Sequence, residues 1–162
     1  MKEIKLSQFG KNRGKYVALV DDEDFEALNQ FNWYAQKHGD TPYAGRKIII
    51  DGKKVMQYMH GAILSGKGVD HIDGNGCNNT RSNLRFCTQS ENAMNMRKQE
   101  NTSSIYKGVS FSKQRVKWEA YIMINRKRIR LGYFDTEVEA AKAYNAKAIE
   151  LFCEFANLNE IN

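Results

Sequence analysis

The sequence predicts an α+β protein built from small antiparallel sheets, and three observations support this. Strand-like runs are short and are separated by turn signals, of which Asp51-Gly52 is the strongest. One pair of such runs is joined by a long polar loop and followed directly by a helix-start signature. Near the C-terminus, three further runs precede a single stretch of helical spacing. We therefore expect an N-terminal small sheet, a strand–loop–strand–helix unit, and a three-stranded antiparallel sheet packed on one helix.

The N-terminal region, residues 1–60, is expected to form strands around one short helix. Lys15–Val20 is a plausible strand, and the acidic run Asp21–Asp24 then opens the helix, because carboxylates are favourable at the positive end of a helix dipole. Metal ligation by this run is the alternative, and capping is the interpretation that we favour. Further strands are expected around Trp33–Gln36 and Tyr43–Ile50, and a third follows the turn.

Residues 61–96 are rich in glycine and asparagine and contain two short apolar runs, Val69–Ile72 and Leu84–Thr88. Each run has the length of one strand of a hairpin, and the polar segment between them is expected to be a long loop. The last residue of the second run and Glu91 have the spacing of a capping box, which predicts a helix from about Gln89.

Residues 97–104 are polar and form the best candidate for a linker, so the last expected domain covers residues 105–162. Within it, Thr136 and Glu139 form a second capping box, and apolar residues follow helical spacing from Glu137 to Phe152. The strand-like runs before this helix are 106–112, 116–124 and 128–134.

The distribution of charge favours an anionic partner more clearly than the net charge of +6 does. Eight basic residues and a single acidic one, Glu119, lie between Ile105 and Arg130, whereas acidic residues dominate from Leu131 to the end. An acidic helix covering one face of the C-terminal sheet would leave the basic residues on the other face. Such a one-sided surface is suited to docking on phosphates.

The cysteines and the hydropathy of the chain indicate in which cellular compartment the protein is expected. The chain has three cysteines and no CxxC pair, which is typical of a reducing compartment, and no ligand set for a structural zinc site is present. No apolar run approaches the length of a membrane span, and the N-terminus lacks a signal-peptide core. We therefore expect a cytoplasmic protein without a membrane partner.

Four residues of the central region have the chemistry that phosphodiester cleavage needs. His71 has the intrinsic pKa of a general base, and Asp70 offers a hard oxygen suited to Mg²⁺ or Mn²⁺. Asn92 can offer its side-chain oxygen to the same cation, and Asn83 can hydrogen-bond to His71 or to nearby backbone. Each also has a structural alternative, since Asp70 could be a turn carboxylate and His71 a hydrogen-bonded core histidine.

The pattern of these residues resembles the HNH homing endonucleases, in the subgroup whose final histidine is an asparagine. The resemblance is carried by Met59-His60, Val69-Asp70-His71-Ile72-Asp73-Gly74-Asn75, Asn78-Asn79, Ser82-Asn83-Leu84-Arg85 and Thr88-Gln89-Ser90-Glu91-Asn92. It implies a ββα-metal nuclease fold, which agrees with the strand, loop, strand and helix expected here.

The resemblance also assigns roles. It implies that His71 is the general base, that Asp70 and Asn92 hold a divalent cation, and that Asn83 steadies the loop and the histidine. Asn95 is the second choice of ligand after Asn92, and an amide oxygen favours magnesium or manganese over zinc. His60 is expected to be structural or to contact phosphate. Arginines nearby are candidates for DNA backbone contacts: Arg81, Arg85 and Arg97.

Residues 105–159 resemble an AP2 domain over nearly its full length. The matching residues are Tyr106-Lys107-Gly108-Val109, Lys117-Trp118, Ala120, Leu131-Gly132, Phe134-Asp135-Thr136, Glu139-Ala140-Ala141, Ala143-Tyr144, Ala156 and Leu158-Asn159. The resemblance implies that the three-stranded sheet enters the major groove of double-stranded DNA. Residues with base-reading or phosphate-contacting roles are then Lys107, Ser110, Ser112, Lys113, Arg115, Lys117, Tyr121, Met123, Arg126, Lys127, Arg128 and Arg130.

Together the two resemblances imply a metal-dependent, site-specific DNA endonuclease, free-standing or intron-encoded, of phage or bacterial origin. A non-enzymatic AP2-type DNA-binding regulator with a decayed nuclease module is the alternative. An RNA-binding protein is a third and weaker possibility, because neither region shows the aromatic stacking motifs of RNA readers. One nuclease module per chain suggests that a bound monomer cuts one strand, and double-strand cleavage would need a dimer or a second event. We expect a monomer, and a dimer on DNA is the alternative.

Overall fold

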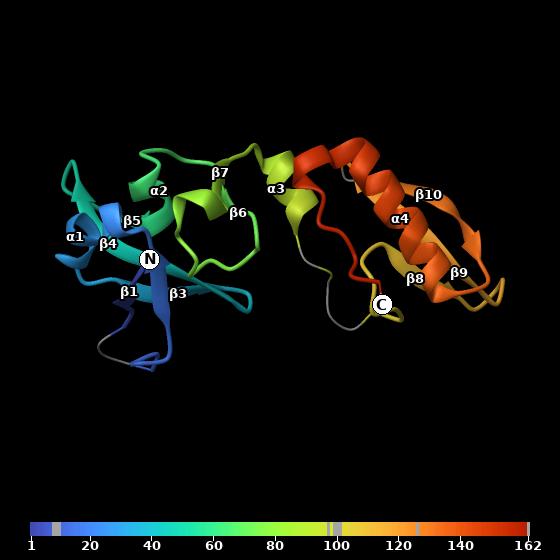
Figure 1. Ribbon diagram of the computed structural model, residues 1–162, viewed down its shortest axis with the longest axis horizontal. Coiled ribbons are helices and arrows are strands. Elements are labelled where there is room, and N and C mark those ends of the chain that lie inside the picture. The colour runs from blue at the N-terminus through green and yellow to red at the C-terminus, as the bar shows by residue number, and fades with distance from the viewer. Residues whose placement is uncertain (8–10, 97, 99–101, 126, 162) are drawn as a thin grey trace. The chain divides into compact units, whose positions relative to one another are not determined.

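The computed structural model describes residues 1–7, 11–96, 98, 102–125 and 127–161, and within them the fold is mixed α/β (Figure 1). It contains four small antiparallel sheets and four α-helices in this part of the chain. The chain divides into two compact units, Met1–Thr88 and Gln89–Asn162. Each unit has a core of its own, so we describe each by itself. Among the described helices, none is long and apolar enough to span a membrane.

The first unit begins with a two-stranded sheet and a helix. Strands β1 (Lys2–Lys5) and β2 (Val17–Val20) pair antiparallel, and helix α1 (Asp22–Asn29) follows directly. Carboxylates lie in the first turn of α1, as the sequence predicts, but its N-cap residue Asp21 makes no side-chain capping bond. The carboxylate of Asp21 instead accepts a hydrogen bond of 2.7 Å from the backbone N–H of Arg81.

A three-stranded antiparallel sheet forms the middle of this unit. Its strands are β3 (Tyr34–His38), β4 (Thr41–Ile50) and β5 (Lys53–Tyr58), with β4 in the centre. Asp51 and Gly52 connect β4 to β5 with φ angles of 49° and 72°. Two successive positive φ angles are the signature of a type I′ turn, so the predicted hairpin is confirmed. The short helix α2 (Met59–Ile63) follows β5.

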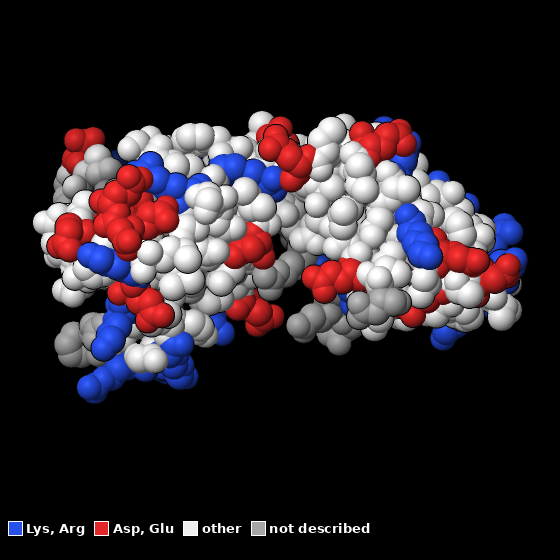
Figure 2. Space-filling view, viewed as in Figure 1, with Lys and Arg blue, Asp and Glu red and all other residues white. Residues whose placement is uncertain are grey.

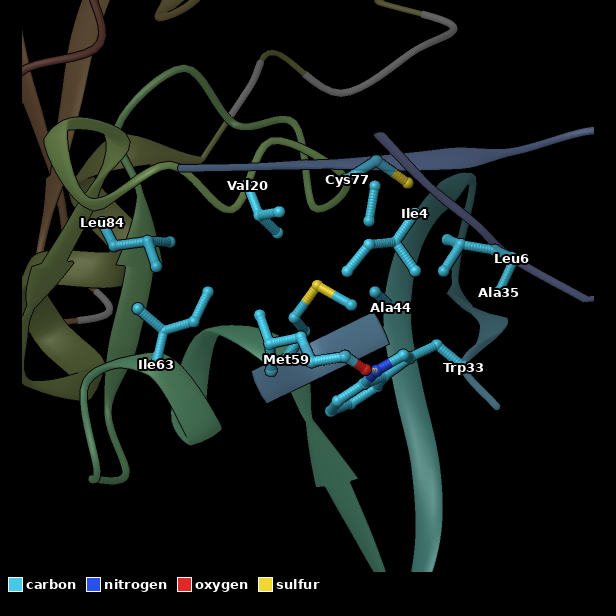
Figure 3. Packing of buried hydrophobic residues seen from close by; sticks show 12 residues of the cluster. Ile4, Leu6, Val20, Trp33, Ala35, Ala44, Met59, Ile63, Cys77 and Leu84 are labelled. Carbon is cyan, nitrogen blue, oxygen red and sulfur yellow. Dashed lines mark hydrogen bonds between the residues drawn. The ribbon is translucent and has the colours of Figure 1, made fainter. Parts of the chain in front are cut away.

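The predicted hairpin with a long polar loop is also confirmed. Strands β6 (Val69–His71) and β7 (Leu84–Phe86) pair antiparallel, and the 3₁₀ helix η1 (Arg81–Asn83) closes the loop between them. Figure 3 shows how this hairpin is anchored: Cys77 of the loop and Leu84 of β7 lie in the same buried cluster as Val20 and Met59. Burial of these side chains therefore attaches the middle of the loop and the start of β7 to the rest of the unit.

The second unit begins with helix α3 (Gln89–Asn95), which starts where the sequence predicts. An antiparallel sheet follows, with β9 in the centre, and a long helix and a 3₁₀ turn close the unit. These elements are β8 (Val109–Ser112), β9 (Lys117–Ile124), β10 (Lys127–Phe134), α4 (Glu137–Phe152) and η2 (Cys153–Phe155). The α4 bounds match the predicted helix, and both bonds of the Thr136–Glu139 capping box are present.

Helix α4 packs on one face of this sheet. Ala140 and Ala141 pack with Val109 and Ala120, and the fully buried Tyr144 packs with Ile122. Small alanine side chains let the helix approach the strands closely, and the aromatic ring fills the remaining space. The alternate residues of β9, including Glu119 and Tyr121, therefore lie on the opposite face of the sheet.

Gly108 is the residue at which this packing leaves no room for a side chain. Its φ is +72°, and a Cβ would lie 2.6 Å from the carbonyl oxygen of Tyr121 and would overlap Cδ2 and Cε2 of the Tyr144 ring. We predict that Gly108→Ala destabilises the second unit by about 3 kcal/mol, from the left-handed conformation and overpacking together. Hydrogen exchange followed by mass spectrometry measures the loss of protection in α4 peptides.

Gly52→Ala is the matched control for this substitution. Gly52 also has a φ of +72°, but nothing lies within 4 Å of the position a Cβ would take. It is expected to cost about 1 kcal/mol, confined to the peptides of β4 and β5. Equal losses of protection in the two variants would show that the close approach to Tyr144 does not add to the loss of stability.

Candidate nuclease site

His71 is a buried histidine at the end of a short strand. It is the last residue of β6, it pairs with Leu84 of β7, and only 4% of its surface is exposed. Its Nε2 lies 3.3 Å from the side-chain oxygen of Asn79, which is itself fully buried. The edge of the adjacent ring of His60 is within contact, with 5.0 Å between ring centroids and an interplanar angle of 89°.

Burial lowers the pKa of the His71 imidazole below its ordinary value. The hydrogen bond with Asn79 and the carboxylates of Asp73 and Asp70 act in the opposite direction but do not offset the burial. The imidazole is therefore neutral near pH 7, which is the form that accepts a proton. Since a neutral ring carries one N–H, donation from Nε2 to Asn79 would leave Nδ1 as the basic nitrogen.

Asn83 holds the shape of the loop between β6 and β7. Its side-chain oxygen accepts from the backbone N–H of Asp73 at 3.0 Å. Its amide nitrogen donates to the Asp73 carboxylate at 2.9 Å and to the carbonyl of Asn78 at 2.8 Å. The sequence left open whether Asn83 hydrogen-bonds to His71 or to nearby backbone. These bonds are with backbone groups and with the carboxylate of Asp73. Asn79, which belongs to the motif that resembles the family but has no role predicted from the sequence, is hydrogen-bonded to His71.

Asp73 is the second centre of this network. Its carboxylate also accepts from the backbone N–H of Asn75 at 2.7 Å and from the side chain of Asn78 at 2.8 Å. Burial tends to raise the pKa of the Asp73 carboxyl, but the hydrogen bonds from Asn75, Asn78 and Asn83 bring it below its ordinary value. Asp73 is therefore an ionised acceptor around which the loop folds.

Asp70 lies directly before His71 and forms a shielded ion pair. Its carboxylate oxygen Oδ2 is 2.9 Å from Nη2 of Arg85, and the two side chains are 7% and 13% exposed. Asp70 and Arg85 are opposite each other in the β6–β7 register, which explains the pairing. Arg85, which we expected to contact the DNA backbone, is thus bound to the predicted metal ligand.

The carboxylate that is predicted to hold a divalent cation is Asp70. Among the described residues, no group of three or more His, Cys, Asp or Glu side chains is arranged to hold a metal. Mg²⁺ keeps several water ligands and is commonly held by one or two carboxylates together with substrate phosphates. Asp70, buried beside the proposed base, is a carboxylate of that kind.

The two asparagines considered as ligands lie on α3, in the second unit. Asn92 is exposed, whereas Asn95 is buried and its backbone carbonyl accepts from the side chain of Asn157 at 2.9 Å. Asn92 is therefore the more accessible of the two, and its role as a ligand stays a prediction.

His60 is surrounded by aromatic rings. It stacks on Tyr58 with 5.4 Å between centroids, and its Nδ1 is buried without a hydrogen-bond partner among the described residues. Burial, with a contribution from His71, lowers its pKa to about 4. His38 also contacts Tyr58, with its Nε2 2.6 Å from the tyrosine hydroxyl. All three histidines of the chain thus gather at this end of the first unit.

The remaining arginines predicted beside the nuclease site differ in their surroundings. Arg81 donates to Asp24 of α1 at 2.7 and 2.9 Å and lies 2.8 Å from Glu23. The acidic run that the sequence assigned to helix capping therefore holds this arginine. Arg97 lies outside the described residues. In the view of Figure 2, acidic and basic side chains are intermixed over both units.

In the second unit, Lys107 is engaged by helix α3. Its ammonium group donates to the carbonyls of Met94 and Met96 at 2.7 and 2.6 Å, and burial lowers its pKa to about 8. Arg126 lies outside the described residues. Residues on the face opposite α4, or in the β8–β9 connection, are Ser110, Ser112, Lys113, Arg115, Lys117, Tyr121, Met123, Arg128 and Arg130. Lys127, predicted to contact phosphate, pairs with Ile124 and so lies at the start of β10 on the α4 side of the sheet.

Comparisons with known proteins agree with the geometry of the first unit. A family model described as HNH endonuclease matches residues 54–94, which contain β6, its loop and β7. An uncharacterized HNH endonuclease of Acanthamoeba polyphaga mimivirus is 34% identical over 160 residues, covering 98% of this chain and 82% of the relative. Protein 3.8 of Escherichia phage T7 is 33% identical over 103 residues, covering 64% of this chain and 84% of the relative. No solved structure matches.

The mimivirus relative is aligned over nearly the whole chain and not over the nuclease motif alone. The buried Asp70-His71 pair lies inside the segment that the family model matches. The chain therefore belongs to the HNH endonuclease family.

Proposed function

We propose that this protein is a metal-dependent, site-specific DNA endonuclease of the homing type, which hydrolyses phosphodiester bonds of double-stranded DNA. The observation that carries the proposal is the state of His71: a buried, neutral imidazole, hydrogen-bonded to Asn79 and adjacent to a buried carboxylate. A group with these properties suits a general base near neutral pH.

In this mechanism Nδ1 of His71 takes a proton from the water that attacks phosphorus. The imidazolium that forms is stabilised by the carboxylates of Asp70 and Asp73, which already interact favourably with its charged form. Asn79 keeps the ring in one orientation because its oxygen accepts the Nε2 proton. Asn83 acts through the loop and keeps Asp73 in place.

Asp70 and Asn92 are the residues that would hold a divalent cation, Mg²⁺ or Mn²⁺. Such an ion would supply stabilisation of negative charge at the scissile phosphate and at the departing oxygen. Arg85 offsets part of the charge of Asp70 and fixes its carboxylate by two N–H bonds from one guanidinium. Asp70 therefore needs little reorganisation to serve as a ligand.

The second unit is proposed to bind the target DNA as an AP2-like domain. A three-stranded sheet with one face covered by a helix, and the other carrying Arg128, Arg130 and Tyr121, supports this part of the proposal. The major groove admits β-structure of this size. A DNA-binding regulator without nuclease activity is the alternative, and the ordered surroundings of His71 favour the enzyme.

Cleavage of supercoiled plasmid DNA tests the enzyme directly. We predict that the full chain nicks or linearises the plasmid with Mg²⁺ and not with EDTA, and that His71→Ala lowers the rate at least 100-fold. His38→Ala is the matched control, because His38 is an exposed histidine of the same unit without a ring contact to His71. Retained DNA binding without any metal-dependent cleavage would favour the regulator.

The dependence of kcat/KM on pH tests the environment of His71. Because burial lowers its pKa, the neutral base persists below pH 6.5, so we predict that activity falls only at a lower pH. Asn79→Asp places a carboxylate next to the ring, favours the protonated form, and should move this loss of activity to higher pH. If kcat/KM of Asn79→Asp falls at the same low pH as that of the unsubstituted chain, the role given to Asn79 is contradicted. Saturating Mg²⁺ at every pH controls for metal binding.

A further inference from the structure

The outward face of the β8–β9–β10 sheet has a carboxylate in the middle of its basic residues. Glu119 lies in β9, opposite Ser110 of β8 and Tyr133 of β10. Its neighbours in the strand, Trp118 and Ala120, pack in the core under α4. Glu119 therefore points away from α4, toward the surface proposed to face DNA, although only 13% of its side chain is exposed.

The two carboxylate oxygens of Glu119 hold one arginine each. Oε2 accepts from Nη2 of Arg128 at 2.9 Å, and Oε1 accepts from Nε of Arg130 at 2.8 Å. The Ser110 hydroxyl accepts a further bond from Arg128 at 3.2 Å. The arginine side chains are 47% and 58% exposed, so they cover Glu119 and remain accessible themselves.

A tyrosine ring supports each of these guanidinium groups. Arg128 lies over Tyr121 at 3.6 Å from the ring centroid, and Arg130 lies over Tyr133 at 5.1 Å. An arginine that is stacked on a ring and bonded to a carboxylate has few remaining rotamers, so ordering it on DNA costs less entropy. Arg130 uses only Nε in its bond with Glu119, and both of its Nη groups make no hydrogen bond to a described residue. Those two groups can form the bidentate contact by which arginine recognises guanine.

We propose that Glu119 is a specificity-determining positioning residue, which orients Arg128 and Arg130 toward guanine bases and lowers the affinity of this face for phosphates. The inference rests on the DNA-binding role proposed for the second unit. Two effects of a carboxylate combine here. It fixes the direction of both arginines, which favours base recognition, and its negative charge repels the DNA backbone and occupies N–H donors that phosphates would otherwise bind.

Removing this carboxylate should therefore change specificity and general affinity in opposite directions. Glu119→Gln keeps the size and shape of the side chain but removes the charge. Arg128 and Arg130 are then free to neutralise phosphates of any sequence, and their preference for guanine declines. A residue with a merely structural role would lower both quantities when it is changed.

The test uses the full chain in a His71→Ala background, which prevents cleavage during binding. Two probes are used: a pool of duplexes with a randomised central segment, and a fixed poly(dA)·poly(dT) duplex, which lacks guanine. With Glu119→Gln we expect several-fold tighter binding to the fixed duplex, and a log K against log salt slope steeper by about one. We also expect guanine enrichment in the selected pool to fall about tenfold, within the range of one bidentate contact.

Glu150→Gln is the matched control. Glu150 is a glutamate on α4, paired with Lys147 at 2.6 Å, so its substitution makes the same change of charge and removes an ion pair away from this face. It should leave guanine enrichment unchanged. Thermal unfolding of each variant confirms that the chain is folded.

The outcomes separate this inference from the function on which it rests. If the parent selects guanine-containing sites and Glu119→Gln selects them equally well, the role of Glu119 is overturned and DNA binding stands. The role is also overturned if Glu119→Gln weakens binding to both probes, because that is the structural outcome. If the parent binds neither probe, the DNA-binding role of the second unit fails, and the inference fails with it.

Discussion

The hydrogen bonds between Asn83 and Asp73 are the interaction on which the nuclease site depends. The segment between β6 and β7 has no strand partner for most of its length, so its buried polar groups need side chains as partners. Asn83 provides three such bonds and Asp73 accepts from its neighbours in turn. The loop that results brings Asn79 against His71. Orientation of the base is therefore a consequence of how the loop is bonded, and the core residues Cys77 and Leu84 attach that loop to the unit.

In both units, charged or titratable side chains on a small sheet are held by pairing with side chains of opposite charge on the neighbouring strand. In the first, a buried carboxylate is paired with Arg85 across two strands, next to a histidine kept neutral by burial. In the second, Glu119 is paired with two arginines across β9 and β10. Small cores cannot immobilise long side chains by packing alone, whereas paired charges and stacked rings restrict them at low cost in buried volume. Sites built in this way are organised before a substrate arrives.

Local signals in the sequence predicted a large part of the fold, and non-local pairings account for what they missed. The Asp51-Gly52 turn and the Thr136–Glu139 capping box act over a few residues, so the β4–β5 hairpin and α4 were predictable. Arg81 and its partner Asp24 are 57 residues apart in sequence, and nothing local indicates that the acidic run holds an arginine.

The same distinction applies to the candidate site. Asp70 and His71 were identified from residue type and from the family pattern, and their burial supports the roles proposed for them. The pairing of Asp70 with Arg85 depends on the β6–β7 register, which the sequence does not specify by itself. Likewise, Lys107 bonds to carbonyls at the end of α3, a contact that a basic residue on a predicted strand gives no reason to expect.

Chemical rescue of His71→Ala is the most direct test of the central claim, which is that His71 is the general base. The measurement is the single-turnover rate of plasmid cleavage at saturating Mg²⁺, with increasing concentrations of imidazole in solution. If His71 is the base, we expect a rate near zero without imidazole, a rise with its concentration, and no effect of imidazole on the unsubstituted chain, because only the variant lacks the base. Cleavage by His71→Ala at the unsubstituted rate in the absence of imidazole would show that His71 is not the general base.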